Sequence, residues 1–234
     1  IFSESARSSY VTRVNYSLKD KYLFEAIVRA DATARYSVEG RWGVFPAFSF
    51  GWRISEEDFM KDSSTWNNLK LRLSHGIMGN DAVSNFDFLT GYNITGGFYL
   101  FGGQPYPIIA SAGLANALVT WETMSISNIG IDGTLWDGAL GFELDIFYRL
   151  REDMLALPDA DIPFHFGADL PRTNLNSKDN RGFDLMIKHK GKVGNKFSYE
   201  INPMISYSRG KFVKLEENIL PTTGVDEATL QANL

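Results

Sequence analysis

The sequence predicts an all-β chain that forms a segment of an antiparallel, up-and-down transmembrane β-barrel. Apolar and polar residues alternate with a period of two along about eight segments, which is the pattern of strands with one apolar face. The connections between these segments are alternately short and long, so tight turns lie at one end of the sheet and long loops at the other. Charged residues gather on one face and are almost missing from the other. A soluble sandwich has no reason to combine these three features.

Composition agrees with this class and excludes several others. Aromatic residues make up 14% of the 234 residues, which suits strands that end in aromatic girdles. The mean hydropathy is −0.17 and no stretch approaches about 18 consecutive apolar residues, so a bundle of membrane helices is excluded. The basic residues are dispersed in a chain of net charge −5, which argues against nucleic-acid binding. The lack of cysteine excludes disulfides, thiolate metal ligands and cysteine nucleophiles.

Residues 10–17, 22–30, 44–53 and 69–77 are the first four predicted strands. Every second residue of each is apolar or aromatic, except Thr12 in the first strand and His75 in the fourth. In chain order the apolar faces carry Tyr10, Thr12, Val14 and Tyr16; Tyr22, Phe24, Ala26 and Val28; Phe48, Phe50 and Trp52; and Leu69, Leu71, Leu73 and Ile77.

Residues 125–135, 140–149, 183–190 and 197–207 are the last four predicted strands. Their apolar faces carry Ile129, Ile131 and Leu135; Leu140, Phe142, Leu144, Ile146 and Tyr148; Phe183, Leu185 and Ile187; and Phe197, Tyr199, Ile201, Ile205 and Tyr207. Pro203 lacks an N–H, so we expect a bulge or weakened pairing there.

The connections follow the long and short alternation. Residues 18–21, 135–138 and 191–196 are short, whereas residues 31–42, 79–122 and 151–180 are long. The connection after the third strand contains Ser55 followed by acidic residues, which predicts a helical turn over residues 55–60 with Ser55 as its N-cap.

The polar face of the predicted sheet is strongly charged and is expected to face the water-filled lumen. Its candidate lumen-facing residues are Arg13, Glu25, Arg29, Lys70, Arg72, Asp132, Glu143, Asp145, Arg149, Asp184, Lys188 and Glu200. The opposite face ends in aromatic residues, namely Tyr10, Tyr16, Tyr22, Trp52, Tyr148, Tyr199 and Tyr207. Tyrosine and tryptophan favour the membrane–water interface, so this face is expected to meet lipid.

Several motifs resemble one known family. They are Asn15–Leu23, Arg41–Pro46, the Gly-Trp-Arg-Ile-Ser-Glu-Glu run at Gly51–Glu57, Asn68–Arg72, Gly76–Asn80, Trp121–Thr123, Asn128–Asp132 and Asn180–Asp184. Together they resemble the SusC/RagA family of TonB-linked outer-membrane transporters of Bacteroidetes, over about residues 8–210.

The resemblance implies a barrel of about 22 strands, filled by an N-terminal plug. It also implies coupling to the TonB complex through a TonB box, a SusD-like surface lipoprotein as partner, import of oligosaccharides or peptides, and location in the outer membrane. Residues 1–234 match only barrel strands toward the C-terminal part, without plug motif or TonB box. The chain is therefore expected to be a piece of a longer polypeptide, with TonB contacting a region that is absent here.

The longest loop carries aromatic residues among glycines. Phe86, Phe88, Tyr92, Phe98, Tyr99, Phe101 and Tyr106 are candidates for binding the substrate or the partner lipoprotein. The alternative is that these rings pack on one another, because a long loop needs some core of its own to stay ordered.

No cofactor, metal site or catalytic residue is predicted. Aspartates in the 151–180 loop could hold Ca²⁺, but their spacing matches no EF-hand. An outer-membrane hydrolase would need a Ser-His or carboxylate constellation, which the sequence does not show. A passive porin or surface adhesin barrel is the remaining alternative to an importer.

Overall fold

Strands account for almost all regular structure in the computed structural model, which describes residues 4–111, 113–158, 168, 170–194 and 196–216. The strands are β1 (Arg7–Leu18), β2 (Tyr22–Thr33), β3 (Trp42–Arg53), β4 (Trp66–Asn80), β5 (Tyr92–Phe101), β6 (Gln104–Ser111), β7 (Glu122–Leu135), β8 (Leu140–Ala156), β9 (Thr173–Val193), β10 (Phe197–Ile201) and β11 (Met204–Lys214). A 3₁₀ turn, η1 (Ile54–Glu56), follows β3. In the described part of the chain, no helix is long and apolar enough to cross a membrane.

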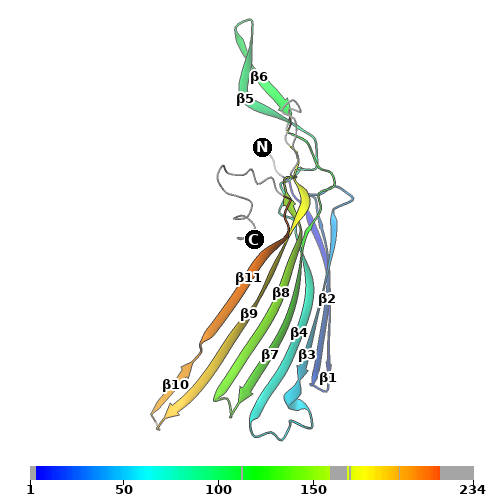
Figure 1. Ribbon diagram of the computed structural model, residues 1–234. Coiled ribbons are helices and arrows are strands. Elements are labelled where there is room, and N and C mark those ends of the chain that lie inside the picture. The colour runs from blue at the N-terminus through cyan, green and yellow to red at the C-terminus, as the bar shows by residue number, and fades with distance from the viewer. Residues whose placement is uncertain (1–3, 112, 159–167, 169, 195, 217–234) are drawn as a thin grey trace.

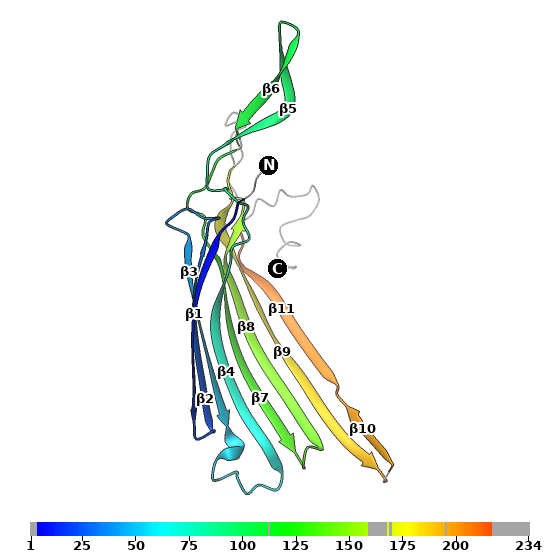
Figure 2. The ribbon, with the colours of Figure 1, turned by 180° about the vertical axis from the view of Figure 1, so that it is seen from behind.

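The main sheet has nine strands in the order β1-β2-β3-β4-β7-β8-β9-β10, with β11 also paired to β9. Its strand pairs are antiparallel, and Figures 1 and 2 show the long strands side by side in chain order. Strands β5 and β6 pair only with each other and form a hairpin beyond the main sheet. This antiparallel, up-and-down order confirms the predicted fold class.

The predicted strands are all present, but the expected number of about eight is too low. The eighth is divided at Pro203 into β10 and β11, as its missing N–H led us to expect. Register is the same on both sides, because Ile201 pairs with His189 and Met204 with Met186. The Pro203 carbonyl still accepts a hydrogen bond of 3.0 Å from the Ile187 N–H. The β5–β6 hairpin was not predicted.

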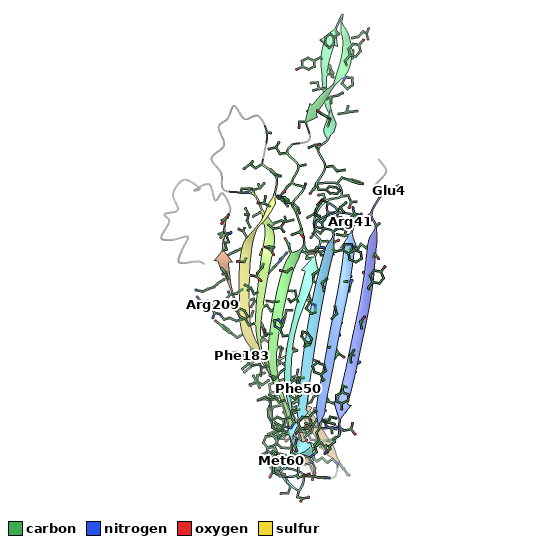
Figure 3. All side chains as sticks on the ribbon, turned by 90° about the vertical axis from the view of Figure 1, so that its right-hand side faces the viewer. Glu4, Arg41, Phe50, Met60, Phe183 and Arg209 are labelled. Atoms are coloured by element: carbon green, nitrogen blue, oxygen red, sulfur yellow. The ribbon has the colours of Figure 1, made fainter. Side chains whose placement is uncertain are left out.

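Tight turns lie at one end of the sheet and long connections at the other. In the turn between β1 and β2, Lys19 and Asp20 have φ of 53° and 55°, and the Lys21 N–H donates to the Leu18 carbonyl at 3.0 Å. Turns with this left-handed backbone match the twist of the strands they join. Figure 3 labels Met60 at the turn end and Arg41 at the loop end.

The expected helical turn over residues 55–60 is shorter and begins one residue earlier, and its expected cap is wrong. The structure has only the short η1, and no side-chain hydrogen bond caps it. The Ser55 hydroxyl oxygen is buried without a hydrogen-bond partner, so Ser55 is not the N-cap. The acidic residue that matters here is Glu57, which binds side chains of the neighbouring strands.

The buried core is small and lies at the loop end. Tyr36, Phe45, Val119 and Trp121 form one cluster, with Phe45 and Trp121 ring centroids 5.3 Å apart. Trp121 Nε1 donates to the Arg41 carbonyl at 3.2 Å, and the Ser37 hydroxyl donates to the Ala117 carbonyl at 2.8 Å. These contacts join the connection after β2 to the segment before β7.

Candidate functional site

The predicted charged residues share one face of the main sheet. Directly paired residues in a sheet point to the same side, and side chains alternate along each strand. Register links Arg72 to Gly130, Gly130 to Asp145, and Asp145 to Asp184. The same counting places all of the predicted lumen-facing residues on this side, from Arg13 on β1 to Glu200 on β10. We call this side of the sheet the polar face.

An ion triad occupies the polar face where β4, β7 and β8 lie side by side. Arg72 donates to both carboxylate oxygens of Asp132, at 2.8 and 2.7 Å, and to Asp145 at 3.0 Å. A Cβ on Gly130 would lie 2.7 Å from the Arg72 guanidinium carbon and from an Asp145 oxygen, so glycine leaves the space that the triad fills. Two-point pairing of arginine with a carboxylate fixes both groups in position.

Further ion pairs continue along the polar face. Lys188 on β9 donates to Glu143 on β8 at 2.6 Å, and Lys190 lies 3.5 Å from Glu200 on β10. These pairs are more exposed than a protein core, so each adds little stability by itself. Opposite charges therefore neighbour each other on this part of the polar face.

A shallow groove of about 550 Å³ lies on the polar face between β1 and β4. Glu25 and Lys70 line it together with Asn15, Ser49 and Ser74. Among the described residues, Glu25 and Lys70 form no ion pair. The groove therefore offers both signs of charge and several hydrogen-bonding groups to whatever fills the space beside it.

The opposite face is apolar, as predicted, and we call it the apolar face. Tyr22 and Trp52 stack at the turn end, with centroids 6.5 Å apart, and Tyr10 and Trp42 stack at the loop end, with centroids 6.1 Å apart. The aromatic residues predicted to end this face all lie on it by register. Two aromatic belts separated by an apolar band are typical of a membrane-spanning barrel.

Glu57 connects the turn end of β2 and β3. Its carboxylate accepts hydrogen bonds from the Tyr22 hydroxyl at 2.6 Å, Trp52 Nε1 at 3.0 Å and Lys21 Nζ at 3.2 Å. These bonds, with that of Tyr22 the strongest, lower the pKa of Glu57 from 4.5 to about 2. The hydrogen bond to Glu57 in turn raises the pKa of Lys21. The periodicity did not indicate this role, although Glu57 ends the Gly-Trp-Arg-Ile-Ser-Glu-Glu motif.

The structure divides the aromatic loop candidates between two places. Tyr92, Phe98, Tyr99 and Phe101 lie on β5 and Tyr106 lies on β6, so these five come together in the hairpin. Phe86 and Phe88 precede it, and Phe86 lines a separate hollow of about 660 Å³ among the long loops. Figure 1 shows the hairpin standing beyond the loop end of the main sheet.

The hairpin is apolar on both faces. Tyr92, Ile94, Phe98 and Leu100 share one face, and Tyr99, Phe101 and Tyr106 share the other. Tyr92 is 79% exposed and Phe101 is 66% exposed. Among the hairpin side chains that the structure describes, Phe101 and Tyr106 form the one ring contact, edge to face with centroids 5.7 Å apart. Residues 88–121 contain no charged side chain, so an exposed, uncharged and aromatic surface projects from the loop end.

Metal binding in the loop before β9 was not predicted, and three of its four aspartates, Asp159, Asp161 and Asp169, lie outside the described residues. Within the described ranges, no cluster of three or more potential metal ligands occurs. On the polar face, Asp132 and Asp145 pair with Arg72, Glu143 pairs with Lys188, and Glu200 pairs with Lys190.

The chain is similar in sequence to several TonB-dependent receptors. It is 33% identical over 212 residues to TonB-dependent receptor P39 of Formosa agariphila, covering 91% of this chain and 20% of that protein. It is 31% identical over 210 residues to TonB-dependent receptor SusC of Bacteroides thetaiotaomicron, covering 88% of this chain and 21% of SusC. The chain thus spans about a fifth of the length of these relatives. No family model matches it.

Solved structures show the same fold. The RagAB peptide importer in its open-open state superposes with a TM-score of 0.82 at 24% identity, covering 95% of this chain and 24% of that one. The FrpB iron transporter from Neisseria meningitidis superposes with a TM-score of 0.56 at 14% identity, covering 92% of this chain and 27% of that one. By its sequence this chain is similar to part of TonB-dependent receptors, SusC among them, and by its fold it is a segment of an outer-membrane β-barrel like that of RagAB.

Proposed function

We propose that this chain supplies barrel wall and extracellular loops to a TonB-dependent importer of a nutrient, either an oligosaccharide or a peptide. The observation that carries the proposal is the division of the main sheet from β1 to β8 into a charged face and an apolar face with aromatic belts at both ends. Such a wall separates lipid from a water-filled interior. The importer role is supported by the similarity to SusC.

In this proposal the polar face lines the lumen and meets a plug domain. All of residues 1–234 belong to the barrel domain, and the plug and TonB box lie in a part of the receptor outside this sequence. The charges of Arg72, Asp132 and Asp145 are paired with one another. Glu25 and Lys70 form no such pair among the described residues, so they can contact the plug or the passing substrate. No bond of the substrate is made or broken, because the wall only guides it.

The hairpin is the proposed contact for a SusD-like surface lipoprotein. Aromatic residues are enriched at the centres of protein interfaces and charged residues are depleted there. The hairpin between Tyr92 and Ser111 has this composition and stands clear of the sheet.

Transport energy comes from the TonB complex, which acts on the plug.

Deletion of the hairpin from the full-length receptor tests the proposal. Residues 93–110 are replaced by a short Gly-Ser linker, and a matched variant shortens the turn-end connection at residues 61–64. We expect the hairpin deletion to remove a co-purifying lipoprotein and to reduce TonB-dependent uptake of oligosaccharides or peptides at least about tenfold, as loss of an interface anchor implies. Uptake that continues unchanged in a tonB deletion strain would instead establish a passive porin, and surface attachment without uptake would establish an adhesin.

A further inference from the structure

Charge on the apolar face is confined to one corner. From β1 through β8 as far as Leu150, the described positions of this face carry no aspartate, glutamate, lysine or arginine. On β9 and β11 the same face carries Arg181, Arg209 and Lys211 together with Asp179, and Glu152 lies on this face at the loop end of β8. A cluster of basic residues on a lipid-facing surface is costly unless something compensates it.

The register makes this corner unfavourable by itself. Arg181 and Arg209 are directly opposite each other on neighbouring strands. Directly opposite residues have Cβ atoms about 5 Å apart, and like charges in such a pair repel. Asp179 lies 3.6 Å from Arg181, which is too long for a good hydrogen bond. Lys211 is directly opposite Asp179, but within the described residues neither Lys211 nor Arg209 forms an ion pair. Three basic side chains thus share the Asp179 carboxylate, and the cluster keeps an excess of positive charge.

The height of the cluster places it at the outer boundary of the membrane. His189 stacks on Tyr199 in the turn-end belt, with ring centroids 5.6 Å apart. Counted from His189, the Arg181–Arg209 pair lies eight residues and the Asp179–Lys211 pair ten residues closer to the loop end. A strand crosses the hydrocarbon in about 9–11 residues, so the two pairs lie on either side of its outer limit. Figure 3 shows Arg209 nearer the loop end than Phe183. Long basic side chains at this level can extend from the apolar wall into the headgroup layer.

Two tyrosines complete the corner. Tyr148 is directly paired with Arg181, and Tyr207 precedes Arg209 by two residues on the same face. Tyr148 is 41% exposed and Tyr207 is 57% exposed, and the Tyr207 ring packs on Phe183 at 6.2 Å. Their rings can lie against acyl chains while their hydroxyls donate to a polar headgroup.

We propose that Arg181, Arg209 and Lys211 form a binding site for the phosphate of an outer-leaflet lipid headgroup. Two guanidinium groups on opposite strands present a fork of N–H donors, which suits a phosphate and removes their mutual repulsion. The site faces lipid, so a lipid-anchored phosphate reaches it without leaving the membrane. It lies on the opposite face of the sheet from the proposed transport path, and it therefore serves lipid attachment and not substrate passage.

The test uses the full-length receptor in detergent and native mass spectrometry with monophosphoryl lipid A, its dephosphorylated form and inorganic phosphate as separate probes. The double variant Arg181→Gln/Arg209→Gln is compared with Lys19→Gln/Lys61→Gln, which removes the same charge from the turn end. We expect the double variant to weaken lipid A binding at least about tenfold, as loss of a charge-assisted pair implies, while the control binds like the unaltered receptor. Dephosphorylated lipid A should bind the unaltered receptor as weakly as lipid A binds the double variant.

Two results would overturn the site. One is equal retention of lipid A by the double variant and the unaltered receptor. The other is a response to inorganic phosphate that depends on both arginines while lipid A does not bind. Variants are checked for a heat-modifiable band on electrophoresis. Should the double variant not fold, Arg209→Gln and Arg209→Lys give the same decision, because the lysine variant keeps the charge and should retain most of the binding.

Discussion

The Glu57 carboxylate joins several side chains at the turn end of the sheet. It accepts three side-chain hydrogen bonds, from Tyr22, Trp52 and Lys21, which come from the turn before β2 and from two neighbouring strands. A carboxylate that accepts several hydrogen bonds is stabilised in its charged form. The pKa of Glu57 is accordingly about 2, below its ordinary value of 4.5. Stability from this group is therefore pH-dependent.

The direction in which stability changes with pH follows from the lowered pKa of Glu57. Because the pKa is lower in the folded state, the stabilisation is fully present above pH 4.5 and is lost as pH falls toward 2. In the full-length receptor we expect Glu57→Gln to lower the unfolding temperature at pH 7 and to flatten its decline between pH 4.5 and 2. Tryptophan fluorescence melts over a pH series measure this. Asp62→Asn, at an exposed position in the same connection, should keep the unaltered pH profile. Parallel profiles for Glu57→Gln and the unaltered receptor would show that the hydrogen bonds contribute nothing.

Residue patterns in the sequence predicted the faces of the wall but not its local contacts. Alternation alone assigns Arg72, Asp132 and Asp145 to one face, and register then brings them into contact. The sequence cannot show which partner Arg72 binds, because the three residues lie on different strands. Ser55 was predicted as a helix cap because serine before acidic residues is typical of one. In the fold Glu57 is instead bound by side chains of neighbouring strands, and no helix of that length forms.

The sequence predicted the strand ends and the β5–β6 hairpin less well than the middles of the strands in the main sheet. β9 runs from Thr173 to Val193, well beyond the predicted 183–190, because its loop end leaves the membrane and no longer needs apolar alternation. The hairpin was missed for the opposite reason, since both of its faces are apolar and a double-residue register shift separates Thr95 from Phe98. Periodicity detects a strand only where its two faces meet different surroundings.

The loop-end cluster around Trp121 joins two connections of the sheet, and we expect substitution of Trp121 to loosen both of them. Trp121 is 8% exposed and packs on Tyr36 and Phe45, which come from distant parts of the chain. Burial raises the pKa of Tyr36, so its hydroxyl stays neutral in this cluster. Truncation of a large buried aromatic residue costs about 3–5 kcal/mol. We expect Trp121→Ala in the full-length receptor to speed hydrogen exchange in the connections 34–41 and 113–120 at least about tenfold, while β2 and β3 stay protected.

Leu118→Ala is the control for that measurement, because Leu118 lies in the same segment but is 86% exposed. It should leave exchange in both connections unchanged. Equal exchange in Trp121→Ala and Leu118→Ala would mean that the cluster does not hold the connections together. Faster exchange throughout the wall would mean that the cluster supports the whole sheet and not the loop end alone.

The main sheet of the described residues is open, because the strands at its two sides do not pair with each other. In the described residues β1 pairs only with β2, and β11 pairs only with β9, so both sides of the sheet present unpaired backbone groups. Open strand edges recruit other chains in water and are not tolerated in hydrocarbon. The charged polar face, with pairs such as Lys188–Glu143, also suits a water-filled lumen better than a small packed interior.

The chain by itself should therefore not form a stable barrel. When residues 1–234 are refolded from urea into detergent micelles, we expect aggregates on size-exclusion chromatography and no heat-modifiable monomer on electrophoresis. The full-length receptor, refolded in the same way, should give both a monodisperse peak and a heat-modifiable band, because the remaining strands pair with β1 and with β11 and close the wall. A monodisperse, heat-modifiable monomer of residues 1–234 would mean that these strands can close on themselves. The polar face would then be packed inside a small barrel, and the assignment of Glu25 and Lys70 to a wide lumen would fail with it.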